Sequence, residues 1–190
     1  MKKSGRSIRC LIFDLDGTLV STQLANFKAY RKAFAAEGIH VSKNQYDQLF
    51  GLRFEDLIKQ IAPKLTTTQK RRVQKLKSIY YRKNFEHLKL NLPLVSFMKM
   101  LKGSYKLALV TTSSRINAES VLRQFKLLNI FDIMIFGEDV NKGKPAPDCF
   151  QLCMNLLRVK PSECLVFEDS KVGIVAAMHA GASVIQVPAL

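Results

Sequence analysis

The chain has 190 residues, which is enough to bury one sizeable core but short for two independent domains. Its 30 basic and 15 acidic residues give a net charge of +15, so an anionic ligand or partner is one interpretation to weigh. The sequence has no Gly-rich phosphate loop, RNA-binding aromatic pattern or zinc-finger spacing, so nothing supports a dedicated nucleic-acid domain.

The first predicted element is a strand over Ile8–Phe13, an unbroken apolar run that leads directly into Asp14-Leu15-Asp16-Gly17-Thr18. Such a run is typical of a strand buried on both faces of a parallel sheet. In open α/β sheets ligands bind beyond the carboxyl ends of the strands, so these carboxylates are candidates for chemistry. A simple turn is the structural alternative. An EF-hand loop is excluded, because Leu19 and Ala25 occupy the positions that require Gly and Glu.

From about Val20 to Leu92 helical patterns follow one another and no strand pattern appears. Three helices are expected, with these apolar faces: Phe27, Tyr30 and Phe34; Leu57, Ile58 and Ile61; Val73, Leu76 and Tyr80. Gly38 and Pro63 are expected to end the first two, and Thr66–Thr68 to cap the third. The aromatic residues are expected to make contacts between helices.

Positive charge is concentrated in this segment, which carries 15 basic and 5 acidic residues. Much of it crowds the third expected helix: Lys70, Arg71, Arg72, Lys75, Lys77, Arg82 and Lys83. A solvated helix face is the favoured interpretation, because runs of charge usually lie at the surface. Attraction of an anionic substrate, or of nucleic acid, to the rim of a site is the alternative.

In the second half of the chain helices alternate with predicted strands, which we place at Leu107–Val110, Ile130–Phe136, Cys164–Phe167 and Ser183–Val187. This alternation is typical of an α/β protein with a Rossmann-like parallel sheet flanked by helices.

Polar groups mark three further places in this half: Thr111 to Ser114 after one strand, Lys144 in Lys144-Pro-Ala-Pro-Asp148, and Glu168 with Asp169 after another strand. Structural alternatives exist for each. Ser113 or Ser114 could cap a helix that runs to about Lys126, the lysine could be a solvated loop residue, and the acids could favour a helix N-terminus.

Taken in order, the aspartate pair, the hydroxyl, the lysine and the acidic pair resemble the four motifs of the haloacid dehalogenase superfamily. The resemblance spans nearly the whole chain. It implies a Rossmann-like catalytic core at 1–19 and 93–190, with a helical cap inserted at 20–92 that closes over the site and selects the substrate. Many relatives continue with another helix, whereas this chain stops at Leu190, so we expect either a minimal sheet edge or a cut chain.

The resemblance implies a phosphatase that hydrolyses a small phosphomonoester through an aspartyl-phosphate intermediate. Asp14 would be the nucleophile, and Asp16 would protonate the leaving oxygen and then deprotonate the hydrolytic water. Thr111, the backbone N–H of Thr112 and Lys144 would bind the phosphoryl group. The acid at Asp16 points to phosphate, because dehalogenases of the family do not carry one there.

Magnesium is the cofactor that the resemblance implies. Its ligands would be Asp14, the backbone carbonyl of Asp16, and Asp169, with Glu168 close by. All are oxygen donors, which suit magnesium better than zinc.

Gly51 to Asp56 resembles the branch that contains β-phosphoglucomutase and small sugar-phosphate phosphatases. This chain has Asn26 where the mutase has a cap histidine, and Arg53 lies one place before the position of the mutase's cap arginine. Asn26, Gly51 and Arg53 are therefore the expected cap contacts to substrate, and hydrolysis is preferred over the mutase alternative.

A second alternative is a non-catalytic binding protein whose basic cap takes an acidic or nucleic-acid partner. The intact set of motif residues counts against it.

The four cysteines do not form a metal-binding pattern, and they are expected to be buried thiols in a reducing compartment. The N-terminal region has no apolar stretch long enough for a signal peptide or membrane span. We therefore expect a cytoplasmic protein.

Overall fold

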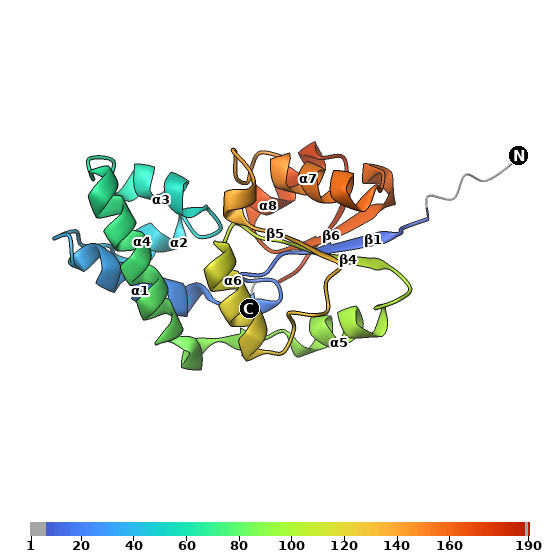
Figure 1. The fold of residues 1–190 in the computed structure, drawn as a ribbon, viewed down its shortest axis with the longest axis horizontal. Coiled ribbons are helices and arrows are strands. Elements are labelled where there is room, and N and C mark those ends of the chain that lie inside the picture. Colours follow the sequence, from blue (N-terminus) through green and yellow to red (C-terminus); the bar gives the residue numbers. More distant parts are fainter. Residues whose placement is uncertain (1–6, 189) are drawn as a thin grey trace, which may run out of the picture.

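The computed structural model describes residues 7–188 and 190. Within these residues, five parallel strands form a sheet in the order β5-β4-β1-β6-β7. Their bounds are β1 (Cys10–Phe13), β4 (Lys106–Val110), β5 (Ile133–Ile135), β6 (Cys164–Glu168) and β7 (Ser183–Gln186). The parallel sheet with helices on both faces confirms the predicted α/β fold (Figure 1).

Two layers of helices cover the sheet: α5 (Leu92–Met100) and α6 (Arg115–Gln124) on one face, and α7 (Asp148–Leu157) and α8 (Lys171–His179) on the other. Successive strand residues point to opposite faces. Leu11 and Phe13 of β1 therefore join the cluster with α5 and α6, whereas Cys10 and Ile12 join the cluster with α7 and α8. Burial on both faces explains the unbroken apolar run of this strand.

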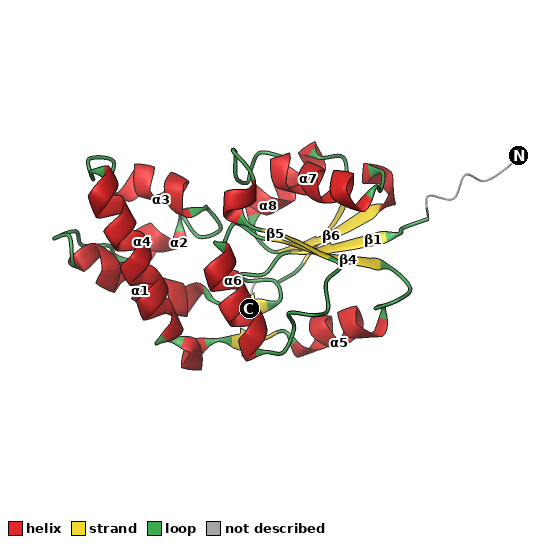
Figure 2. Cartoon of the chain, in the orientation of Figure 1, coloured by secondary structure: helices red, strands yellow, loops and turns green. Residues whose placement is uncertain are grey.

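Four helices lie beside this core (Figure 2): α1 (Gln23–Ala35), α2 (Lys43–Asp47), α3 (Phe54–Ile61) and α4 (Thr67–Arg82). The helices α1, α3 and α4 confirm the three that the apolar spacing predicted, and Thr66 caps α4 as expected. They share an apolar cluster of their own, in which Tyr30 stacks on Phe34. The short helix α2 had no apolar face long enough to predict it.

The prediction that no strand lies between Val20 and Leu92 was wrong. The strands β2 (Val20–Ser21) and β3 (Lys89–Leu90) form an antiparallel pair. Two residues are too few to show the alternation by which a strand is recognised. Because the pair joins the two segments that lead into and out of the helical group, it supports the proposed division into a core at 1–19 and 93–190 and a cap at 20–92.

Three predicted boundaries need correction. The first strand, expected from Ile8, begins at Cys10. The strand expected at Ile130–Phe136 is limited to β5, because the chain turns before it: the Ile130 N–H donates to the Leu127 carbonyl. The helix expected to run to Lys126 ends at Gln124, because Lys126 adopts a positive φ of 56° that no right-handed helix contains.

Short 3-10 turns complete the secondary structure: η1 (Phe85–His87), η2 (Gly137–Asp139) and η3 (Pro161–Glu163). The four cysteines are free and buried, as expected. Among the described residues, none of the helices combines the length and the apolar composition needed to cross a membrane.

Candidate active site

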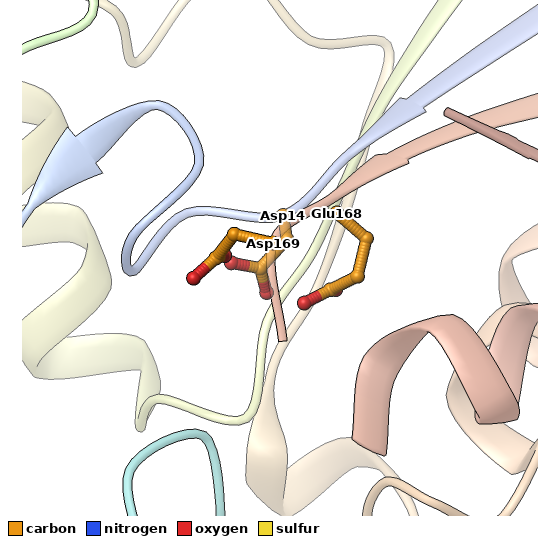
Figure 3. Close-up of side chains that lie close together, drawn as sticks. All are labelled: Asp14, Glu168 and Asp169. Atoms are coloured by element: carbon orange, nitrogen blue, oxygen red, sulfur yellow. The ribbon is translucent and has the colours of Figure 1, made fainter. Parts of the chain in front are cut away.

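Three acidic residues meet at the carboxyl edge of the sheet, where β1 and β6 lie side by side (Figure 3). Asp14 directly follows β1, Glu168 is the last residue of β6, and Asp169 comes next. Each contributes a carboxylate oxygen to a group whose atoms all lie within 4.8 Å of one another. The parallel register places Phe13 beside Phe167, and it is this pairing that brings together residues more than 150 positions apart.

Lys144 is inserted into this cluster and is only 2% exposed. Its ammonium donates to Asp14 Oδ1 and Glu168 Oε2, both at 2.7 Å, and to the Val110 carbonyl at 3.2 Å. All three ammonium protons therefore have partners. The alternative of a solvated loop lysine was wrong, and the structure brings Lys144 to the predicted nucleophile.

The cluster carries an excess of negative charge, because one ammonium faces three carboxylates. Burial, together with the charge of Glu168, raises the pKa of Asp14 well above its usual value. Burial raises the pKa of Asp169 to about 6. Burial alone would lower the pKa of Lys144, but Asp14 and Glu168 raise it above its ordinary value. The site is thus suited to a cation in addition to Lys144.

Gly17 and Thr18 shape the side of the cluster that faces Asp169. The Thr18 hydroxyl donates to Asp169 Oδ1 at 2.7 Å. Gly17 has a φ of +100°, and a Cβ there would lie 2.2 Å from Asp169 Oδ2. Only glycine permits this close approach of the backbone to the carboxylate.

The Asp16 carboxylate is held apart from the other three, by side chains from both the core and the helical group. Oδ1 accepts from the Thr22 hydroxyl at 2.5 Å and from Asn26 Nδ2 at 3.4 Å. Oδ2 accepts from the Ser113 hydroxyl at 2.7 Å and from the Thr111 hydroxyl at 3.3 Å. These bonds fix the orientation of the predicted acid and base.

The polar run after β4 makes contacts that its expected capping role does not include. Ser114 occupies the N-cap position of α6, but among the described residues its side chain makes no capping hydrogen bond. Ser113 donates to Asp16, and Thr111 accepts from the Ser113 N–H at 3.1 Å. Thr112 donates to the Gly51 carbonyl at 2.9 Å, which ties the loop between α2 and α3 to the core.

A cavity of about 50 Å³ opens beside Asp16, between the helical group and the core. Asn26, Gly51 and Thr112 line it, as do Lys77 and Asn117, two residues that the sequence did not predict for the site. A water needs roughly 10–15 Å³ of space, so the cavity is large enough to admit a small polar group.

Of the three predicted cap contacts to substrate, Arg53 is the one that the structure does not bring to this cavity. Its guanidinium pairs with Asp56 at 2.7 Å and donates to the Val140 carbonyl at 3.2 Å. The arginine thus links the loop before α3 to the core, and its role in substrate binding stays a prediction.

Sequence reasoning missed Thr22, Ser113 and the buried state of Lys77. The sequence placed Thr18 in the first motif but did not predict its hydrogen bond to Asp169. Ser113 acts on Asp16 from a distant segment, so the chain offers no local signal for it. Thr22 is only six residues from Asp16, but a hydroxyl at a helix start is ordinarily read as a cap.

The family model described as haloacid dehalogenase-like hydrolase matches residues 11–187. The chain belongs to this family. A phosphorylated carbohydrates phosphatase of Thermotoga maritima is 32% identical to it over 181 residues, covering 92% of this chain and 82% of the relative. The fructose-1-phosphate phosphatase YqaB of Escherichia coli is 31% identical over 178 residues, covering 93% of this chain and 95% of the relative.

The fold agrees with that of solved haloacid dehalogenase-like proteins. The crystal structure of CbbY from Rhodobacter sphaeroides in complex with phosphate has a TM-score of 0.87 and 26% sequence identity, covering 96% of this chain and 87% of that one. The four motifs that the sequence suggested therefore lie in a chain whose fold matches that of a solved relative over 96% of this chain.

Proposed function

We propose that this haloacid dehalogenase-like protein is a magnesium-dependent phosphatase that hydrolyses a small phosphorylated metabolite through an aspartyl-phosphate at Asp14. The observation that carries the proposal is the buried bond between Asp14 and Lys144, beside two further carboxylates. Both curated relatives described above are phosphatases, which supports the same reaction class.

The donor set fits magnesium, because every candidate ligand is a hard oxygen. Both oxygens of Glu168 already accept hydrogen bonds, from Lys144 and from Ser170. Asp14 and Asp169, together with the Asp16 carbonyl, are therefore the proposed ligands, and Glu168 positions Lys144. When bound, the cation would offset the repulsion between a phosphate dianion and the carboxylates.

Asp14 is oriented for attack by its bond to Lys144, which also offsets the charge that builds up on the transferred phosphoryl group. Asp16 borders the cavity, and it is proposed to give a proton to the leaving oxygen and to take one from water. Thr111 and the backbone N–H of Thr112 are proposed to bind the phosphoryl oxygens.

Hydrolysis is preferred over the mutase reaction because this chain lacks the cap histidine of the mutase. Asn26 stands where the mutase has its histidine, and it donates to Asp16 rather than carrying a titratable ring. The small cavity fits a metabolite better than a polymer.

The test is phosphate release by wild-type protein and Asp14→Asn, with magnesium and with chelator, over hexose phosphates, phosphoglycolate, nucleotides and an aryl phosphate. We expect magnesium-dependent release that falls at least about 1,000-fold in Asp14→Asn, because the nucleophile is gone. The free energy of unfolding should change by less than about 1 kcal/mol, since the amide keeps the shape and relieves repulsion between carboxylates.

Asp148→Asn is the matched control, because it removes a carboxylate from the start of α7 that is not part of the cluster. It should leave activity unchanged. Activity that survived in Asp14→Asn would remove Asp14 as the nucleophile, and no release by wild-type protein would favour the mutase or the binding protein.

A further inference from the structure

Lys77 on α4 is a buried cation that the proposed mechanism does not use. The sequence placed it with the solvated charges of that helix, but it is only 6% exposed, whereas its neighbour Lys75 is exposed. A surface lysine normally covers apolar groups with its stem and keeps its ammonium in water. Here the ammonium lies over the rings of Tyr81 and Tyr30, 4.3 and 5.1 Å from their centroids.

No ion pair joins Lys77 to any carboxylate in the described part of the chain. Burial lowers the pKa of Lys77 to about 8, so the residue is still charged at neutral pH. A buried charge without a counterion is costly, and proteins rarely keep one unless it has a task. The side chain lines the cavity beside Asp16, where a ligand can reach it.

Asn117 of α6 lines the same cavity from the core side and is 5% exposed. Its Oδ1 is buried and has no hydrogen-bond partner among the residues that the structure describes. Buried amide oxygens are almost always bonded, so this one is an acceptor that awaits a donor. The cavity therefore offers a cation from one wall and an acceptor from another.

We propose that Lys77 and Asn117 form a subsite that selects phosphomonoesters carrying a second anionic group next to a hydroxyl. Lys77 binds the anionic oxygen, and Asn117 accepts from the hydroxyl. The inference rests on the proposed function, because it concerns the part of the substrate that is not transferred. The cavity volume of about 50 Å³ admits a small polar group of the substrate.

Three substrates separate these contacts. 3-Phosphoglycerate carries both the carboxylate and the hydroxyl. sn-Glycerol 3-phosphate lacks the carboxylate, and 3-phosphopropionate, the phosphate ester of 3-hydroxypropionate, lacks the hydroxyl next to the carboxylate. Fructose 1,6-bisphosphate and fructose 1-phosphate form a second pair, in which the extra anion is a phosphate. The ratios of kcat/KM within each set isolate one group at a time.

Wild-type protein should prefer 3-phosphoglycerate over sn-glycerol 3-phosphate. Lys77→Met should lower that ratio about 30-fold, the size expected for one hydrogen bond to a charged group. Asn117→Leu should lower the ratio of 3-phosphoglycerate to 3-phosphopropionate about 10-fold, since it removes a neutral acceptor. Lys75→Met, an exposed lysine on the same helix, is the control and should change neither ratio.

If Lys77→Met lowers only the kcat/KM ratio of fructose 1,6-bisphosphate to fructose 1-phosphate, the result would support the subsite and identify the anion as phosphate. Ratios that are the same in wild-type protein and Lys77→Met for both sets would overturn the inference and leave the phosphatase intact. Should wild-type protein release no phosphate, titration calorimetry of 3-phosphoglycerate against Asp14→Asn, with and without Lys77→Met, still decides. Equal affinities there would refute the subsite independently of turnover.

Discussion

At the scale of single residues, Gly17 is the position where the backbone most narrowly determines the site. Two separate constraints require glycine here. The backbone has a φ of +100°, and an added Cβ would lie only 2.2 Å from Asp169 Oδ2. We expect Gly17→Ala to displace Asp169 and to lower magnesium-dependent phosphate release more than about 100-fold, the loss of two or more charge-stabilising contacts. Steady-state kinetics with increasing magnesium would measure it.

Gly103→Ala separates the two constraints, because Gly103 has a φ of +90° but, among the residues that the structure describes, none lies within 4 Å of the added Cβ. It should cost about 1 kcal/mol of backbone strain and keep full activity. Equal activity loss in both variants would show that strain, and not the contact with Asp169, is responsible.

The residues of the site differ in how far the sequence predicted them. Asp14, Asp16 and Lys144 could be found, because each lies at an edge of a predicted element within a recognisable ordered set. Thr22 and Ser113 could not, because a hydroxyl near a helix start is ordinarily read as a cap. The bond from Ser113 to Asp16 arises only when the loop after β4 comes to the end of β1, and the bond from Thr22 closes the short connection between Asp16 and α1.

At the scale of elements, the strands of the sheet were predictable because burial on both faces leaves an unbroken apolar run. The pair β2 and β3 was not, since two-residue strands have no pattern of their own. The helix α4 was predicted correctly in extent but not in its environment. A run of charges predicts a solvated face, and only packing against α1 and α6 shows that one member, Lys77, is turned inward.

The burial of Lys77 predicts how the stability of the protein depends on pH. The pKa of Lys77 is about 8 in the folded protein against 10.5 for the free group, so between these values the unfolded chain binds more protons. Wild-type stability therefore gains from this residue as pH rises from about 8 to 10.5, and the cost of the buried charge is fully present below pH 8. Lys77→Met should stabilise the protein by about 1–3 kcal/mol at pH 7 and by less at pH 10.

Urea unfolding of both proteins at pH 7 and pH 10 measures the difference, with Lys75→Met as the control. The other groups around Lys77 are Asp16, Tyr30, Tyr46 and Tyr81. Burial raises the pKa of each tyrosine above its usual value, so they add little in this window. A stabilisation that did not depend on pH would assign the gain to packing rather than to the charge.

At the scale of the whole molecule, positive charge and the acidic cluster are separated. The helical group carries most of the excess. The carboxylates lie at the sheet edge, where Lys144 is the one lysine paired with them among the described residues. A field of this sign attracts phosphate esters to the opening between the two parts. Composition gave the sign and rough location of the charge, but the position of the cavity between α4 and α6 depended on how the parts dock.

The same imbalance predicts how metal affects the stability of the whole protein. Because Lys144 pairs with two of the three carboxylates but supplies a single positive charge, the metal-free protein should fold but stay destabilised by the remaining repulsion. Magnesium at about 100 times its Kd should add roughly 2.7 kcal/mol to the free energy of unfolding. For a chain of this size that raises Tm by roughly 5–10 °C relative to protein in chelator. Asp169→Asn should abolish the increase and Asp148→Asn should keep it, whereas an equal increase in both would mean that magnesium binds elsewhere.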